Sequence, residues 1–251
     1  MEQHIYQTIL SSITDYSSII EEVHLFEHWI VIKAAGRYEM STRFSPLDGY
    51  SEQSSDSWLG NLPGQNAAQI AKEYLASDNV LHVAAGMASL KCVLPHIDQV
   101  FENSAMDHFA ELTKTHTSCV IGHFKDAAQW RSEGRPVSII ELKPRDQDIH
   151  WNNSHEALSK AEIIFMTGLT LVNGTFGEVI KRTPSARYRI IMGPTVPLTP
   201  SLFSLGLHWL GTSRIIDSEK ALRYFGMGGG SVMYAPEGAL HKVNIGNIQP
   251  T

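Results

Sequence analysis

Short apolar runs alternate with helical patterns along the second half of the chain. The predicted strands cover residues 119–122, 137–142, 162–166 and 188–192, with a weaker one at 207–210. The predicted helices lie between or after them, near residues 126–132, 154–161, 176–182, 201–205 and 218–225. Strand–helix alternation at this spacing is typical of a parallel, doubly wound sheet with right-handed crossovers.

The first hundred residues lack this alternation. Isoleucines spaced four apart within residues 4–14 form one apolar face of a helix. Period-two alternation through residues 29–43 predicts an antiparallel hairpin. We therefore expect an α/β protein with a small N-terminal α+β domain (residues 1–105) and a C-terminal domain built on a doubly wound parallel sheet (residues 106–251).

Two more helices are predicted after a long polar loop. The loop, residues 44–66, is rich in Ser, Gly, Pro, Asp and Asn, and a loop of this length inside a compact domain is often functional. The helices cover residues 67–75 and 80–94, and the second ends before Pro95. Small residues dominate positions 84–89 of this helix, and we favour close helix packing over ligand contact as their role.

The charge balance limits the partners of this 251-residue chain. There are 20 basic and 26 acidic residues, which gives a net charge of −6 and disfavours nucleic acid and anionic membranes as main partners. No apolar run reaches the roughly 18 residues of a membrane span, and the N-terminus lacks the pattern of a signal peptide. We therefore expect a cytoplasmic protein in which Cys92 and Cys119 are reduced thiols.

Ligands of open parallel sheets bind beyond the carboxyl ends of the strands. The densest polar stretch at such an end is residues 167–175, after the third predicted strand. Together with the other strand ends it gives the candidate ligand-binding set: His123, Phe124, Glu141, Thr167, Gly168, Thr170, Asn173, Gly174, Thr175, Gly193, Pro194 and Thr195. Capping of the following helix is an equally good role for Asn173 and Thr175. A glycine-rich stretch at residues 226–231 is flexible enough to close over a ligand.

Familiar catalytic motifs are absent from these strand ends. The first strand runs into Gly-His-Phe and not into Gly-x-Gly-x-x-Gly, so the dinucleotide fingerprint is missing. The sequence also lacks a nucleophile elbow, a Walker loop and a Cys-x-x-Cys pair. Among the 12 histidines, the His24 and His28 pair is treated as coincidence, because the chain runs straight into a predicted strand. His123 is the histidine expected to line a pocket, because it follows a strand end.

Four strings of residues carry a resemblance to a known family: positions 120–124, Ile140-Glu141 followed by Pro144, positions 166–175, and positions 192–197. Over roughly residues 110–235 the chain resembles the heavy-metal chelation family, long known as a domain of unknown function. The run Thr-Gly-Leu-Thr-Leu-Val-Asn-Gly-Thr is the most specific part of this resemblance. The first hundred residues are more loosely similar, and Lys91-Cys92 stands where similar members often carry Asn-Ala.

The resemblance implies a domain like the N-terminal domain of enolase joined to a Rossmann-like domain, with a ligand pocket in the cleft between them. It implies no enolase activity, because the catalytic barrel of enolase is missing. The family's proposed role is binding or chelation of metals, or handling of metal-bearing small molecules.

Three functions stay open at this point. The first is a binding or chelation protein for a metal or metal complex, with His123 and Glu141 as candidate ligands of a divalent transition metal. The second is an enzyme acting on a small anionic or nucleotide-like molecule, with His123 as general acid/base. The third is an interaction protein with a vestigial cleft, which the polar density of residues 167–175 disfavours. A homodimer is ordinary for an α/β protein of this size, but the sequence carries no interface signature.

Overall fold

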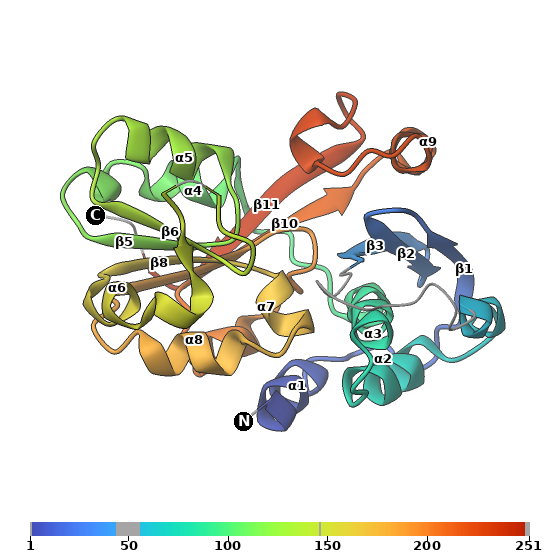
Figure 1. Ribbon diagram of the computed structural model, residues 1–251. Helices are drawn as coiled ribbons and strands as arrows, with labels where there is room; N and C mark the ends of the chain where they lie inside the picture. The colour runs from blue at the N-terminus through green and yellow to red at the C-terminus, as the bar shows by residue number, and fades with distance from the viewer. Residues whose placement is uncertain (1, 44–55, 146, 249–251) are drawn as a thin grey trace.

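The computed structural model describes residues 2–43, 56–145 and 147–248, and these form a mixed α/β structure with two sheets (Figure 1). The small sheet is antiparallel, in the order β1-β2-β3. The large sheet has eight strands, in the order β4-β11-β10-β9-β8-β5-β6-β7. Most of the predicted loop at 44–66 lies outside the described residues; its last part forms the 3-10 helix η1 (Asp56–Asn61).

The small sheet consists of β1 (Ile20–Leu25), β2 (Trp29–Ala34) and β3 (Arg37–Thr42). β2 and β3 are the predicted hairpin, which is confirmed, whereas β1 is an additional strand. Helices α2 (Ala67–Leu75) and α3 (Val80–Val93) cover one face of this sheet, and α9 (Ser218–Gly226) covers the other (Figure 1).

The small residues of α3 serve helix packing, as predicted. A Cβ atom added to Gly86 would lie 2.9 Å from Cβ of Tyr74 in α2 and 3.0 Å from the backbone nitrogen of Leu75. These distances are too short for real Cβ contacts, so only glycine allows the two helices to approach this closely.

The strands of the large sheet are, in chain order, β4 (Phe101–Glu102), β5 (Ser118–Ile121), β6 (Val137–Glu141), β7 (Ile149–His150), β8 (Ile163–Thr167), β9 (Tyr188–Met192), β10 (Trp209–Ile215) and β11 (Leu240–Gly246). The five predicted strands are present and run parallel to one another. β11 was not predicted, and it runs antiparallel to both β10 and β4, so the sheet is mostly parallel. Figure 1 shows β10 and β11 running out of the large sheet toward α9 and the small sheet.

Helices cover both faces of the large sheet (Figure 1). α4 (Ala105–Phe109) and α5 (Lys125–Ser132) lie on one face, and α6 (His155–Lys160) and α8 (Phe176–Arg182) lie on the other. The remaining helices are α1 (Glu2–Leu10), α7 (Leu169–Val172), η2 (Leu112–Lys114), η3 (Trp151–Asn153), η4 (Pro200–Leu205) and η5 (Val232–Tyr234). Cover on both faces explains why residues 163–166 of β8, in the middle of the sheet, are apolar without interruption.

The hydrophobic core is continuous between the two sheets. One buried cluster includes Ile5 and Ile9 of α1, much of α3, and Ile121 and Ile164 of the large sheet. A second cluster fills the opposite face of the large sheet around Phe109. None of the helices within the described residues has the length and hydropathy needed to cross a membrane.

The strand order reverses between β5 and β8. β6 lies on one side of β5, and the next long strand, β8, lies on its other side. The connections that leave β5 and β8 therefore diverge, and such a switch point leaves a crevice at the carboxyl ends of the strands.

Candidate ligand-binding cleft

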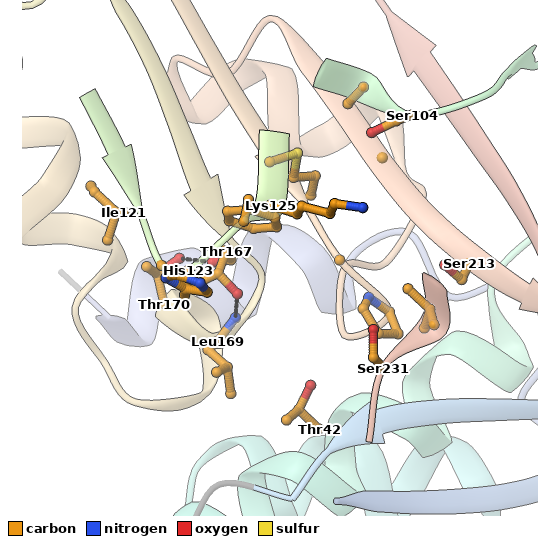
Figure 2. Close-up of a pocket in the computed structure, with 18 of the residues that line it drawn as sticks. Thr42, Ser104, Ile121, His123, Lys125, Thr167, Leu169, Thr170, Ser213 and Ser231 are labelled. Carbon is orange, nitrogen blue, oxygen red and sulfur yellow. Dashed lines mark hydrogen bonds between the residues drawn. The ribbon is translucent and has the colours of Figure 1, made fainter. Parts of the chain in front are cut away.

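A cavity of about 470 Å³ lies at this switch point (Figure 2). Its wall is formed by the carboxyl ends of β5, β6, β8 and β9 with the loops after them, by residues of β10 and β11, and by Trp29 and Thr42 of the small sheet. Residues 103–105 and 230–233 complete it. In Figure 2, His123, Thr167 and Thr170 lie across the cavity from Ser213 and Ser231. The volume falls in the range of small-molecule sites.

Most of the candidate residues lie on this wall. They come from four different strand ends, which the parallel sheet brings to one edge. The residues in question are His123, Phe124, Glu141, Thr167, Thr170, Asn173, Thr175, Gly193 and Pro194.

Three candidates, Gly168, Gly174 and Thr195, are not on the wall. Gly168 packs against the loop after β9, where an added Cβ would lie 2.8 Å from Cγ2 of Val196. Gly174 has a φ of 71° and borders a separate small hollow beside α1. Thr195 is 1% exposed, and its Oγ1 accepts a hydrogen bond from the backbone nitrogen of Thr42 (3.0 Å) and donates one to Oγ1 of Thr42 (3.0 Å). These residues shape the loops behind the wall.

The polar loop after β8 is held by its own side chains. Thr170 Oγ1 donates to the carbonyl oxygen of Thr167 (2.8 Å), and Leu169 N donates to Oγ1 of Thr167 (3.3 Å), as Figure 2 shows. Asn173 Oδ1 accepts from both the backbone nitrogen (3.2 Å) and Oγ1 (2.7 Å) of Thr175. The predicted side-chain cap of α8 is wrong: Thr175 is the N-cap residue, but its side chain makes no capping bond.

Gly122 allows the ends of β5 and β8 to meet. Its φ is 107°, and an added Cβ would lie 3.1 Å from Cβ of Thr167. The chain then turns to His123, whose exposed ring lies 2.7 Å from the guanidinium of Arg145. Because a guanidinium can only donate, Nε2 of His123 must be the acceptor in this contact.

Cationic side chains outnumber acidic ones on the wall. Lys125, Lys143 and Lys242 line the cavity, and their ammonium groups make no ion pair with any described residue. Asp126 and Glu141 supply negative charge. Burial, and then the nearby Asp148 carboxylate, raise the pKa of Glu141 above its ordinary value. The balance favours an anionic group on a bound molecule.

Several wall residues were missed from the sequence because they are distant in the chain or lie in strands that were not recognised. They are Trp29, Thr42, Asn103, Ser104, Ser213, Lys242 and Asn244. Trp29 Nε1 donates to the carbonyl oxygen of Gly229 (2.6 Å), and this bond places the glycine-rich stretch against the small sheet. Gly230 and Ser231 of that stretch then reach the wall.

A known family matches the part of the chain that forms the large sheet. The model of the family described as "Putative heavy-metal chelation" (DUF364) covers residues 104–244, more than half of the 251-residue chain. The chain belongs to the DUF364 family. The resemblance noted in the sequence is thereby confirmed.

Two solved structures of the DUF364 family share the fold. One, from Desulfitobacterium hafniense DCB-2, is of a protein with unknown function; it matches with a TM-score of 0.83 at 21% identity, covering 98% of this chain and 99% of that chain. The other, from Pyrococcus horikoshii and also of unknown function, matches with a TM-score of 0.75 at 15% identity and the same coverage. Among curated proteins, uncharacterized protein MJ0500 of Methanocaldococcus jannaschii is 32% identical over 108 residues, or 41% of this chain. The match spans 42% of that relative's length.

The description of the DUF364 family raises the question of whether the side chains fit a heavy metal. Within residues 2–43, 56–145 and 147–248, no group of three or more His, Cys, Asp or Glu side chains could hold a metal ion. Cys92 and Cys119 are buried and absent from the wall. Burial raises the pKa of both thiols, that of Cys119 to about 12, which opposes the thiolate form that binds soft metals. The described donor set does not fit direct coordination of a heavy metal.

Proposed function

We propose that the protein binds a small organic molecule in a cleft between two domains, and that a heavy metal enters this cleft as a complex with that molecule. The domains would be an enolase-N-terminal-like one (residues 1–105) and a Rossmann-like one (residues 106–251). The observation that carries the proposal is a cavity of about 470 Å³ at the switch point whose wall is polar and cationic but lacks a cluster of metal ligands among the described residues.

His123 and Glu141 act in this proposal through polar contacts. Nε2 of His123 already accepts a hydrogen bond from Arg145, and a bond to a metal would require that contact to break. The complex would bring its own donor atoms, which removes the need for three protein ligands. The three wall lysines favour a complex with negative charge.

Thermal unfolding tests this proposal. The protein would be heated with free Ni²⁺, with Ni²⁺ held by small chelators, and with a panel of nucleotides, S-adenosylmethionine and pterins. We expect an organic molecule or a chelated metal to raise Tm, since a ligand of the folded state stabilises it, and free Ni²⁺ to leave Tm unchanged. Leu169→Trp fills the cavity and should abolish the shift, whereas Met227→Trp, at a position 73% exposed and off the wall, should retain it.

Two results would contradict the proposal in different ways. Tight uptake of free Ni²⁺ that His123→Ala abolishes would establish direct coordination. A ligand shift that is the same in Leu169→Trp and in the unaltered protein would move the binding site out of the cleft.

An enzyme is the second candidate function, because Glu141 is a half-buried carboxyl on the wall whose pKa is raised. Perturbed carboxyl groups in a cleft are typical of acid/base sites. The substrate would be a small anionic or nucleotide-like molecule, with His123 as general acid/base once Arg145 releases it. Stabilisation by one organic ligand without metal, followed by turnover that His123→Asn abolishes, would favour the enzyme.

A further inference from the structure

A polar recess lies on the β10 and β11 side of the cavity, across from the predicted strand ends. Gly211 pairs with Asn244, and Ser213 pairs with Lys242, in the antiparallel register of the two strands. Directly opposed residues of an antiparallel pair share one face, with Cβ atoms about 5 Å apart. All four residues are on the cavity wall.

The orientation of the Asn244 amide follows from its partners. One side-chain atom lies 3.2 Å from the carbonyl oxygen of Phe101 and 3.0 Å from that of Asn103. Both partners can only accept, so this atom is the nitrogen Nδ2, and both of its N–H groups are used. The other atom is Oδ1, which accepts no hydrogen bond from any described residue.

Asn244 Oδ1 faces the cavity. Asn244 as a whole is only 1% exposed. In the described part of the chain, the side-chain atoms that are fully enclosed and have no hydrogen-bond partner are Ser41 Oγ and Trp209 Nε1. Asn244 Oδ1 is not one of them, so this oxygen is not fully enclosed. A Cβ added to Gly211 would lie 2.5 Å from Oδ1, so the glycine keeps the space over the oxygen open. This acceptor, which has no donor among the described residues, is placed to receive an N–H or O–H group from a ligand.

Lys242 and Ser213 supply hydrogen-bond donors and a positive charge beside Asn244 Oδ1. The half-buried ammonium of Lys242 has no ion pair with a described residue, and the hydroxyl of Ser213, in a residue 3% exposed, has no side-chain partner there. In Figure 2 the side chain of Lys125 reaches across the cavity toward the side that carries Ser104. The recess therefore offers an acceptor beside donors and positive charge.

We propose that this recess seats an amino-carboxylate group: a primary or secondary amine donates to Asn244 Oδ1, and the adjoining carboxylate accepts from Lys242 Nζ and Ser213 Oγ. This inference rests on the proposed function and names the chemical class of the cleft ligand. Amines and carboxylates are also donor groups with which small chelators hold divalent transition metals. A secondary amine keeps one N–H after it coordinates a metal, so the contact with Asn244 is retained in the complex.

Iminodiacetate and glutarate test the inference as a matched pair, because they differ only by an amine in place of a central CH₂. Their binding would be measured by calorimetry and by ligand-observed NMR. We expect glutarate to bind at least about tenfold more weakly, since it leaves Oδ1 unpaired. Lys242→Met should weaken both ligands by about tenfold or more, and Lys72→Met, on the exposed side of α2, should change neither.

Two variants probe the Asn244 contact independently. Asn244→Leu should reduce the affinity for iminodiacetate to that for glutarate, but it also removes the bonds that hold the Phe101 and Asn103 carbonyls. Gly211→Ala keeps the Asn244 side chain but puts a methyl group 2.5 Å from the position of Oδ1, too close for the amide to stay where it is, so it should also abolish the preference for the amine.

Equal binding of the two acids, a preference for glutarate, or no binding of either overturns the amino-carboxylate assignment. Binding that is unchanged in both Lys242→Met and Gly211→Ala overturns the location. The proposed function is tested separately by Leu169→Trp. If this variant blocks the binding of no ligand, the proposed function is wrong. If it blocks a ligand whose affinity is unchanged in Lys242→Met and Gly211→Ala, the proposed function stands and only the recess assignment is wrong.

Discussion

Lys91 is a buried cation at the seam between the two sheets. Its side chain is 4% exposed, and Nζ contacts Oε2 of Glu39 (3.0 Å), the carbonyl oxygen of Met40 (3.0 Å) and that of Pro194 (2.6 Å). Three acceptors satisfy the three N–H donors of an ammonium group. Lys91 thus joins α3, β3 and the loop after β9, and it does not line the cavity.

Lys91→Met should destabilise the protein by about 3 kcal/mol, because it leaves the Glu39 carboxylate nearly buried without its counter-charge. Urea unfolding followed by circular dichroism measures the change. The matched control is the double variant Lys91→Met/Glu39→Gln, which removes both charges and should recover part of the loss. A loss under about 1 kcal/mol would mean that water reaches Glu39 and that the pair behaves like one on the surface.

At the scale of elements, the central parallel strands were predictable because they are buried on both faces. Residues 163–166 of β8 are apolar without interruption, and such a run is typical of a strand that helices cover on both sides. β1 was missed because its sequence, Ile-Glu-Glu-Val-His-Leu, places charges within a one-faced strand. β11 was missed because Lys242 and Asn244 interrupt its apolar pattern.

The same interruption explains why part of the cleft was missed. Lys242 and Asn244, the polar residues that prevented β11 from being recognised as a strand, line the cavity. Sequence rules tend to fail at such functional sites. Thr42 was missed for a different reason: its contact with Thr195 joins residues that are 153 positions apart in the chain. No local pattern reports a contact of that kind, whereas the strand-end residues follow directly from the topology.

Glu22 ties together the three strands of the small sheet. Its carboxylate in β1 accepts from Lys33 Nζ of β2 (3.0 Å) and from Tyr38 Oη of β3 (2.9 and 3.0 Å), and it contacts His24 Nε2 (3.0 Å). Lys33 first, then His24 and Tyr38, lower the pKa of Glu22 from 4.5 to about 2. A lowered pKa in the folded state means stabilisation that is present above pH 4.5 and is lost as the pH falls toward 2.

Glu22→Gln should therefore lower Tm at pH 7, and the difference from the unaltered protein should shrink below about pH 4.5. Because Glu22 is 38% exposed, we expect a loss of only about 1 kcal/mol, or about 3 °C. Scanning calorimetry between pH 3 and pH 7 measures this dependence, with the exposed Glu27→Gln as control. A difference in Tm that stays constant across this range would exclude the ionised carboxylate as its source.

Over the whole molecule, elements of each half of the chain pack against or pair with elements of the other half. α9, from the second half, packs through Ala221 and Phe225 on Trp29 and Val31 of the small sheet. β4, at the end of the predicted N-terminal domain, pairs at the edge of the large sheet. Residues from both halves line the cavity. Interlocked halves of this kind are expected to unfold together.

Thr195→Val tests how the contact between Thr42 of the small sheet and Thr195, in the loop after β9, couples the two sheets. The change keeps the shape of the side chain but removes both hydrogen bonds to Thr42, and it leaves the backbone N–H of Thr42 without its acceptor. In the unaltered protein, hydrogen exchange should report the same opening free energy for β2–β3 and for β5–β8, because both open through global unfolding. In the variant, β2 and β3 should exchange about tenfold faster, which corresponds to a cost of ~1.4 kcal/mol for the N–H that loses its acceptor.

The distribution of the change decides between two arrangements. Faster exchange confined to β2 and β3 means that the small sheet opens as a unit of its own once the tie is cut, as a division near residue 105 predicts. An equal increase in β5 and β8 means that the Lys91 and Trp29 contacts still hold the halves together, so that the sheets form one cooperative unit. Thr115→Val, at an exposed position outside the seam, should leave exchange in both sheets unchanged. In the first case the cleft can widen by local opening of the small sheet, and in the second a ligand must enter through the cavity as it stands.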